Sequence, residues 1–150
     1  MQKKQALKLT LANYLAKVDL ATGALDTTFT QSTGLTGVVY ALTIAGNALY
    51  VGGLFGYYRN TSAQNIAKLD PTTGNIDTTF SQNAGFDGTV VALCASHVAL
   101  YVGGSFTHFK GTTLQRLAKI DLSSGGLDTT FSTSSGTDGW VYSLAFAGSS

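Results

Sequence analysis

The sequence predicts an all-β protein, a β-propeller of four-stranded antiparallel blades, from three observations. The segment Leu15–Asp19 recurs twice, each time after a step of 51 residues. Apolar residues inside each copy form short runs and alternations with the period of strands, and not of helices. Eighteen glycines among the 150 residues mark tight turns between these runs. Four-stranded repeats with a period of about 40 to 50 residues are typical of propeller blades.

The repeat keeps its register along the whole chain without a gap. Each copy contains a segment Leu/Ile-Ala-Lys-apolar-Asp and a segment apolar-Asp-Thr-Thr-Phe. The first lies at 15–19, 66–70 and 117–121, and the second at 25–29, 76–80 and 127–131. We therefore expect a single repeat domain over residues 1–150, made of about three blades. Its copies are expected at about 1–63, 64–114 and 115–150, the last of them incomplete.

Each copy contains four segments with strand character. The first is a mostly apolar run suited to burial on both faces. The second ends in a glycine pair, which marks a bulge or a close approach of two backbones. The third is the segment that ends in Asp, and a turn such as Asp70–Gly74 leads from it to the fourth. In this order the segments are 38–44, 89–95 and 140–146; 48–53 and 99–104; 15–19, 66–70 and 117–121; and 76–80 with its copies.

The phase of the repeat at the two termini predicts the assembly. The chain opens near a third strand, with a substitute for the second strand at Ala6–Thr10, and closes after a first strand. Three blades are fewer than the four to eight that close a ring. We therefore expect a homodimer, a two-fold, isologous, six-bladed ring in which terminal half-blades complete each other by strand exchange. The alternative is a β-trefoil, which closes three four-stranded repeats within one chain.

Composition and charge argue against several partners. A net charge of +1 creates no broad field that would collect nucleic acid or an anionic membrane. The single cysteine, Cys94, excludes an intrachain disulfide and supplies no cysteine-based metal site. Lys17 and Asp19 interrupt the apolar run that a signal peptide would need, and we expect no membrane span. An extracellular or virion-surface location is slightly favoured.

One resemblance covers most of the chain. Ala67–Phe80 reads Ala-Lys-Leu-Asp-Pro-Thr-Thr-Gly-Asn-Ile-Asp-Thr-Thr-Phe, and Leu100–Phe106 reads Leu-Tyr-Val-Gly-Gly-Ser-Phe. Together they resemble the bacterial delta-sixty repeat, and the resemblance runs from Leu15 to Gly148. It implies a propeller-forming domain of unknown function, often in exported or surface proteins of bacteria. It implies no catalytic residues.

All eight carboxylates are aspartates at repeat-equivalent positions. An active site needs unlike groups that converge at one place. This symmetry instead favours a structural role in turns and strand ends, where Asp accepts bonds from backbone N–H groups. We therefore expect no enzyme, and we expect each lysine of the third strands to pair with the Asp two residues further on. The positions are Lys17, Lys68 and Lys119, and Asp 19/70/121, 26/77/128 and 87/138 opposite Thr36.

No metal ion or cofactor is expected. Asp19–Asp26 places two carboxylates around a Gly turn, which would suit Ca²⁺, but it lacks the ligand pattern of an EF-hand loop. His97 and His108 do not recur in the repeat, and neither has a nameable partner for metal binding or catalysis. Hydrolytic activity is disfavoured, and it would gain support if Asp87 or Asp138 met one of these histidines in the fold.

The loops between the second and third strands carry the candidate binding residues. Both loops read aromatic, aromatic, basic, small, and such groups can stack on sugar rings or anchor a protein. We expect a non-enzymatic scaffold or protein-binding module, with a carbohydrate-binding, lectin-like propeller as the alternative. In a competing interpretation Tyr58 and Phe109 fill the gap between blades and the basic groups stay solvated. The candidates are Tyr57, Tyr58, Arg59, His108, Phe109 and Lys110.

Overall fold

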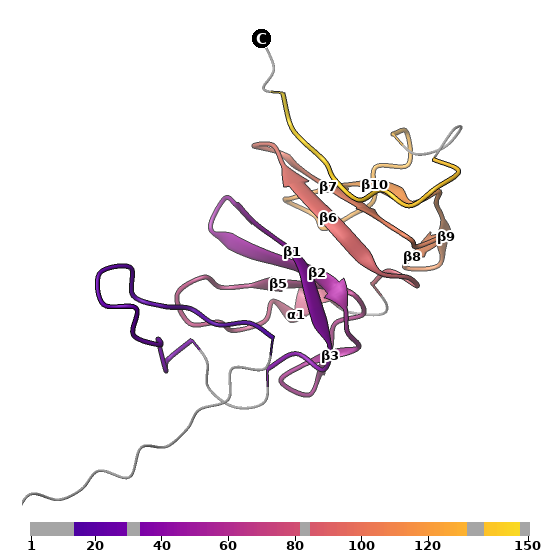
Figure 1. Cartoon of the computed structure of the whole chain (residues 1–150). Helices are drawn as coiled ribbons and strands as arrows, with labels where there is room; N and C mark the ends of the chain where they lie inside the picture. Colours follow the sequence, from indigo (N-terminus) through magenta and orange to yellow (C-terminus); the bar gives the residue numbers. More distant parts are fainter. Residues whose placement is uncertain (1–13, 30–33, 82–84, 132–136, 148–150) are drawn as a thin grey trace, which may run out of the picture.

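Two three-stranded antiparallel sheets of the same design form the body of the protein. The computed structural model describes residues 14–29, 34–81, 85–131 and 137–147. The first sheet has the order β1 (Val38–Ala45), β2 (Ala48–Leu54), β5 (Ile66–Leu69). The second sheet has the order β6 (Val90–Ala95), β7 (Ala99–Gly104), β10 (Leu117–Asp121). Figure 1 shows the sheets side by side, and the predicted all-β, antiparallel fold is confirmed.

The second glycine of each pair makes room within its own sheet. Gly53 and Gly104 lie opposite the start of the first strand, where the register of the ladder shifts in both sheets. A Cβ at either position would overlap a carbonyl oxygen of that strand. The predicted bulge is therefore confirmed, at the same place in both sheets.

The first glycine of each pair makes room for the next copy of the repeat. A Cβ at Gly52 would overlap the side chain of Val90 on β6, and a Cβ at Gly103 would overlap that of Val141. β6 contacts both β1 and β2. Val141 lies against the second sheet in the equivalent place, and its N–H donates to the carbonyl oxygen of Gly104 at 3.2 Å. The bare glycine thus lets each first strand approach the sheet before it.

The loops after β2 and β7 contain two small hairpins. β3 (Tyr57–Tyr58) pairs with β4 (Thr61–Ser62), and β8 (His108–Phe109) pairs with β9 (Thr112–Thr113). The two residues at the tip of each hairpin have positive φ, as in a type I′ turn. They are Arg59 and Asn60, and Lys110 and Gly111.

The fourth strand is not formed as predicted. In the second copy it is reduced to one bridge, between Leu69 and Ile76, and its remainder forms the short helix α1 (Thr78–Ser81). The cause is Asp77, whose Oδ1 accepts the backbone N–H groups two and three residues further on, as an N-cap residue does. Local capping therefore outweighs strand pairing at this position.

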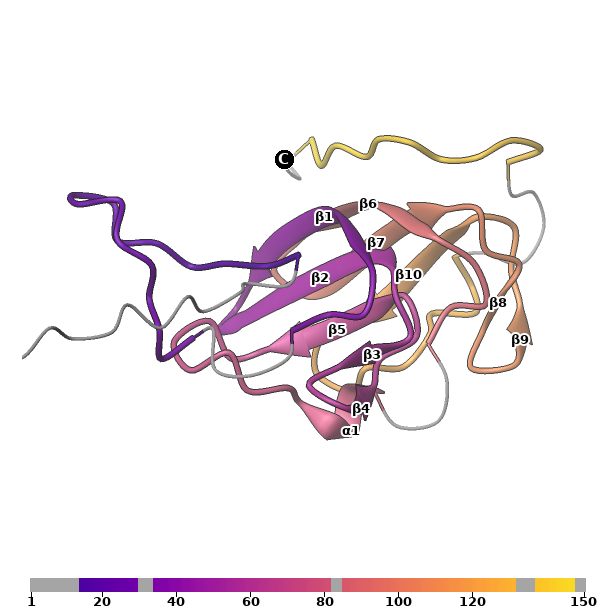
Figure 2. The ribbon, with the colours of Figure 1, turned by 60° about the horizontal axis from the view of Figure 1, so that its bottom comes forward.

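Two further predicted strands have no ladder. Residues 15–19 make a single bridge, from Val18 to Leu25, and residues 140–146 are irregular. The equivalent segments in the two sheets pair with β2 or β7, which are the second strands of their copies. Among the described residues, no second strand lies beside 15–19 or 140–146. The expected substitute strand at Ala6–Thr10 lies outside the described residues. Figures 1 and 2 show 14–29 on the side of the first sheet and 137–147 on the side of the second.

The core consists of two clusters of buried side chains. One joins the two sheets and includes Tyr50, Val90 and Leu100. The other, with Phe29 and Tyr58, ties the first sheet to the residues before it. Neither sheet closes on itself, so the number of blades and the closed ring stay predictions.

Candidate functional site

The six candidate residues lie on the two hairpins, and two of them are buried. Tyr58 and Phe109 are each 2% exposed. The Tyr58 hydroxyl donates to the carbonyl oxygen of Gly74 at 2.7 Å. The Phe109 ring packs on that of Phe86, with the ring centroids 4.6 Å apart. These two aromatics fill the core, in keeping with the packing interpretation.

The two basic candidates lie over aromatic rings. The Arg59 guanidinium donates to the carbonyl oxygen of Phe29, and its centre lies 5.0 Å from the ring of the preceding tyrosine. The Lys110 ammonium lies 5.8 Å from the ring of Phe80 and 5.3 Å from that of Phe109. Each basic group thus covers an aromatic side chain that the core needs.

Tyr57 and His108 are the exposed pair, at equivalent places of the two hairpins. The residue that holds each hairpin is also equivalent. Thr36 Oγ1 accepts the backbone N–H groups of Gly56 and Tyr57 at 3.2 and 3.0 Å. Asp87 Oδ1 accepts those of Thr107 and His108 at 2.7 and 2.8 Å. Asp87 therefore caps the second hairpin as Thr36 caps the first.

Asp87 also binds the imidazole of His108. Its Oδ2 lies 2.8 Å from His108 Nδ1 and accepts the Thr107 hydroxyl at 2.7 Å. Partial burial of Asp87 opposes its charge, but the bonds from His108 and Thr107 outweigh this and hold the pKa of the carboxyl well below its usual range. The fold thus brings together one of the Asp and His pairs on which hydrolysis would depend.

Among the described residues, no nucleophile completes a catalytic triad around this pair. The Thr107 hydroxyl lies 3.0 Å from Nδ1, the same ring nitrogen that Asp87 binds. A catalytic triad needs its nucleophile at Nε2, and in the described part of the chain no group makes a hydrogen bond to the Nε2 of His108. The geometry therefore orients a surface imidazole without activating a nucleophile.

A cavity of about 410 Å³ adjoins the hairpins. Its lining contains both capping residues, Thr36 and Asp87, together with the amide side chains of Gln64 and Asn65. We call this cavity, with the exposed side chains of Tyr57 and His108 beside it, the hairpin rim. A cavity of this size with a few polar groups is within the range of small-ligand sites.

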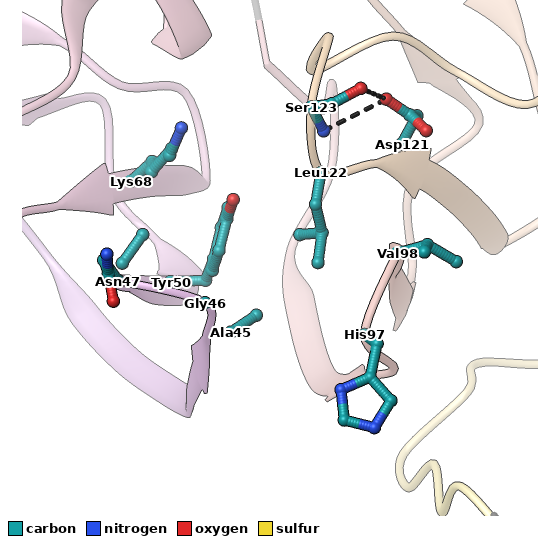
Figure 3. Close-up of a pocket in the computed structure, with 11 residues that line it drawn as sticks. Ala45, Gly46, Asn47, Tyr50, Lys68, His97, Val98, Asp121, Leu122 and Ser123 are labelled. Carbon is teal, nitrogen blue, oxygen red and sulfur yellow. Dashed lines mark hydrogen bonds between the residues drawn. The ribbon is translucent and has the colours of Figure 1, made fainter.

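A second cavity, of about 430 Å³, opens between the two sheets at the end where the β1–β2 turn lies (Figure 3). Tyr50 and Lys68 line it from the first sheet, and Asp121 and Leu122 line it from the second. Lys68 Nζ lies 2.9 Å from a carboxylate oxygen of Asp77, and Asp121 Oδ1 accepts the Ser123 hydroxyl at 2.6 Å. The charged groups of this cavity are thus already engaged, and none of the six candidates lines it.

The predicted pairing of the strand lysines is wrong. Each lysine binds the Asp nine residues further on, because the bridge to the fourth segment places that Asp opposite it. The Asp two residues on instead closes a turn: Asp70 Oδ1 accepts the N–H groups of Thr72 and Thr73 at 2.8 and 2.7 Å. The ion pairs are Lys17–Asp26 at 3.1 Å, Lys68–Asp77 at 2.9 Å and Lys119–Asp128 at 2.9 Å.

Among the residues that the structure describes, no three His, Cys, Asp or Glu side chains lie close enough together to hold a metal ion. No helix in the described ranges is long and apolar enough to cross a membrane.

One equivalent pair of side-chain contacts, between a sheet and the segment that follows it, was not predicted from the sequence. Asn65 and Arg116 occupy one repeat position and share a positive φ of 63° and 62°. Asn65 Nδ2 donates to the carbonyl oxygen of Phe86 at 2.8 Å, and Arg116 Nη1 donates to that of Thr137 at 2.9 Å. Phe86 and Thr137 are themselves repeat equivalents. Two unlike side chains thus make the same bond to the segment that leads into the next first strand, and the only sign of it in the sequence is the tolerance of Asn for positive φ.

The comparisons with known proteins support the architecture. No curated protein and no solved structure matches the chain. Residues 47–80 match the model of a family described as a beta-propeller domain of unknown function, DUF5122. The match favours a propeller over a β-trefoil, whereas the finer assignment to the delta-sixty repeat stays a prediction. From the start of β2 to α1, the chain is similar to a propeller-type domain of unknown function.

Proposed function

We propose that the chain is a non-enzymatic β-propeller scaffold. The observation that best supports this proposal is that the aspartate side chains bind backbone N–H groups in turns and caps. In the described repeats the carboxylate closes a turn, or caps a helix or a hairpin, of its own copy, as Asp70, Asp77 and Asp87 do. Groups with the same local task in successive copies do not converge on one reaction centre.

The Asp87–His108 pair gives the sharpest test of this proposal. We expect the protein not to hydrolyse chromogenic esters, phosphates or glycosides above the rate in buffer. If hydrolysis appeared, and His108→Ala and Asp87→Asn both removed it while Asp138→Asn did not, the pair would be catalytic and the proposal wrong.

We propose further that two copies close a six-bladed ring by sharing blades. Residues 137–147 occupy the first-strand position against the second sheet. Residues 14–29 carry the third and fourth segments, with their bridge and the Lys17–Asp26 ion pair. In the described ranges each segment lacks the strands that its copies pair with, and exchange between two chains would supply partners.

Sedimentation equilibrium tests the shared ring. The expected mass is twice the 15.6 kDa of one chain. A particle with the mass of one chain at micromolar concentration would contradict the two-copy ring and leave the non-enzymatic scaffold untouched.

Carbohydrate binding at the hairpin rim is the second candidate function. Tyr57 is 52% exposed, and it follows Gly56, which lines the cavity together with amide and carboxylate groups. Aromatic faces next to such groups suit sugar rings. A glycan array would show binding that Tyr57→Ala abolishes, Tyr57→Phe retains, and Val98→Ala, a change of an exposed residue away from the rim, leaves intact. Retained binding in Tyr57→Ala would place any glycan site elsewhere.

A further inference from the structure

One face of β1 is apolar and open to solvent. Leu42 and Ile44 share this face and are 52% and 59% exposed. Tyr40, which is 54% exposed, lies beside them within the register shift at the start of the strand. No charged residue occurs in β1. A strand face of this kind is rarely left uncovered, because it offers a contiguous apolar surface on an antiparallel sheet.

The repeat shows what covers the same face in the next copy. Leu93 and Ala95 of β6 are the equivalents of Leu42 and Ile44, and both pack against the core cluster that joins the two sheets. The partner there is the first sheet, since β6 contacts β1 and β2. By the same step of 51 residues, we expect the face of β1 to pack against a preceding sheet, on its first strand and the strand next to it.

Residues 137–147 occupy the position of such a first strand, without a ladder, against the second sheet. Arg116 Nη1 donates to the Thr137 carbonyl oxygen at 2.9 Å and the Val141 N–H donates to Gly104, which hold the segment on the second sheet. The Phe146 ring stacks on that of Tyr101, with centroids 6.2 Å apart. Trp140 and Tyr142 form an aromatic pair, 5.8 Å between centroids, and both remain exposed.

Residues 137–147 pack on the second sheet at Gly103, whereas the first sheet packs on β6 through Gly52. Figure 1 shows 137–147 (yellow) beyond β6 and β7 as seen from β1. The open face of β1 cannot reach residues 137–147 within the chain in this arrangement. Two chains placed end to end, however, satisfy both surfaces twice. This is the closed two-fold case of a head-to-tail contact.

We infer that the open face of β1, formed by Leu42 and Ile44, is the docking surface for residues 137–147 of a second copy of this chain. The inference rests on the proposed two-chain ring and specifies where the copies meet. Leu42 and Ile44 of one copy pack on this segment of the other, beside its exposed Trp140 and Tyr142, as their equivalents Leu93 and Ala95 pack on the first sheet within the chain.

Charge substitutions on each surface test the contact. Leu42→Glu with Ile44→Glu blocks the β1 face, and Trp140→Glu with Tyr142→Glu blocks the segment. Each double variant should sediment with the mass of one chain. All four side chains are exposed in the single chain, so circular dichroism should show an unchanged fold. Leu20→Glu with Val98→Glu, two exposed apolar residues on neither surface, is the matched control and should keep the mass of two chains.

Mixing the two blocked variants tests the head-to-tail match itself. One variant then offers an intact segment and the other an intact β1 face, so a 1:1 pair held by a single contact should form at raised concentration. A pair that meets β1 to β1 would not be restored by mixing.

The outcomes separate the inference from the proposed ring. If the native chain has the mass of one chain, the docking surface and the proposed ring are both wrong. If it has the mass of two chains and Leu42→Glu with Ile44→Glu keeps that mass, or if the mixture does not pair, the ring stands and this docking surface is wrong.

Discussion

Asp77 combines a helix cap and an ion pair in one carboxylate. Oδ1 accepts the N–H groups that begin α1, and Oδ2 lies 2.9 Å from Lys68 Nζ. The bond from the Thr79 hydroxyl, helped by Lys68, lowers the pKa of Asp77 to about 2. Asp128 holds the same place in the next copy, and its bonds from Thr130 and Lys119 also bring its pKa to about 2. The charged carboxylate is thus the form that the folded state stabilises.

Acid should therefore weaken the fold. A carboxyl with a lower pKa in the folded than in the unfolded state adds stability above its unfolded pKa, here 3.8, and loses it as the pH falls through the folded value. We expect urea midpoints to be constant from pH 7 to 5 and to fall between about pH 4 and 2. Asp77→Asn, which can still cap the helix, should flatten part of this fall.

Two further variants separate the roles of the Asp77 side chain. Asp77→Ala removes the cap as well, and at pH 7 it should lower the free energy of unfolding by about 1 kcal/mol more than Asp77→Asn does. Asp138→Asn, at an exposed position outside these pairs, serves as the control. Equal losses in the two Asp77 variants would show that the ion pair matters and the cap does not.

Two adjacent tyrosines should respond to mutation very differently. Tyr58 is buried with its hydroxyl on Gly74, so Tyr58→Phe should cost about 1 kcal/mol and Tyr58→Ala about 3 to 5 kcal/mol. Tyr57 is exposed, so Tyr57→Ala should change the free energy of unfolding by less than about 0.5 kcal/mol. Thermal unfolding of the three variants measures this. A large loss in Tyr57→Ala would mean that its ring is covered in the intact protein.

At the scale of elements, the repeat revealed the strands of both three-stranded sheets, whereas the short paired strands β3, β4, β8 and β9 lie in segments predicted as loops. The alternation and the glycine pairs were sufficient for β1, β2, β6 and β7 because their partners follow directly in the chain. The fourth segment was predicted wrongly because Asp-Thr-Thr serves equally as a strand end and as a helix cap, and local bonds decide between them. The lysine pairs were predicted wrongly because they depend on the register across a turn, which spacing within one strand does not contain.

The candidate site was predicted at the level of the loop, and the side chains within it were not separated. The pattern aromatic, aromatic, basic, small located both hairpins, but burial of Tyr58 against exposure of Tyr57 follows from the I′ turn and the pleat of the short strands. The Asp87–His108 bond joins residues 21 apart at one edge. Only the pairing of the hairpin with its cap brings them together.

Gly52 provides a test of the contact between the two sheets. Gly52→Ala should lower the free energy of unfolding by about 1 to 3 kcal/mol, because the new Cβ meets Val90. Val90→Ala alone removes a buried side chain and destabilises too. In the double variant the overlap is relieved, so its loss should be smaller than the sum of the single losses by about 1 kcal/mol or more.

The matched control for Gly52 is Gly56→Ala. No heavy atom lies within 4 Å of a Cβ built at Gly56, so this change should be nearly neutral. Strict additivity of Gly52→Ala and Val90→Ala would mean that β6 does not pack on β2 in solution.

At the scale of the whole molecule, a row of sheets has two ends, and the chain must satisfy both. Within the row, each sheet covers the first strand of the next, through Gly52 and Val90 and again through Gly103 and Val141. The repeat specifies this contact between neighbours but not how many neighbours there are, because each copy contacts only the next. In the proposed two-chain ring the blade number is set by the assembly, and a measurement that depends on concentration tests this.

The melting temperature should therefore rise with protein concentration. When unfolding is coupled to dissociation of two chains, each tenfold dilution removes about 1.4 kcal/mol of stability. Spread over the unfolding entropy of two 150-residue chains, at about 2.1 cal/mol/K per residue, this shifts the melting temperature by about 2 °C. Scanning calorimetry between 1 and 100 μM would then show a shift of about 4 °C for the native chain, and none for the variant Leu42→Glu with Ile44→Glu. A melting temperature of the native chain that does not move with concentration would mean that each chain folds and melts alone.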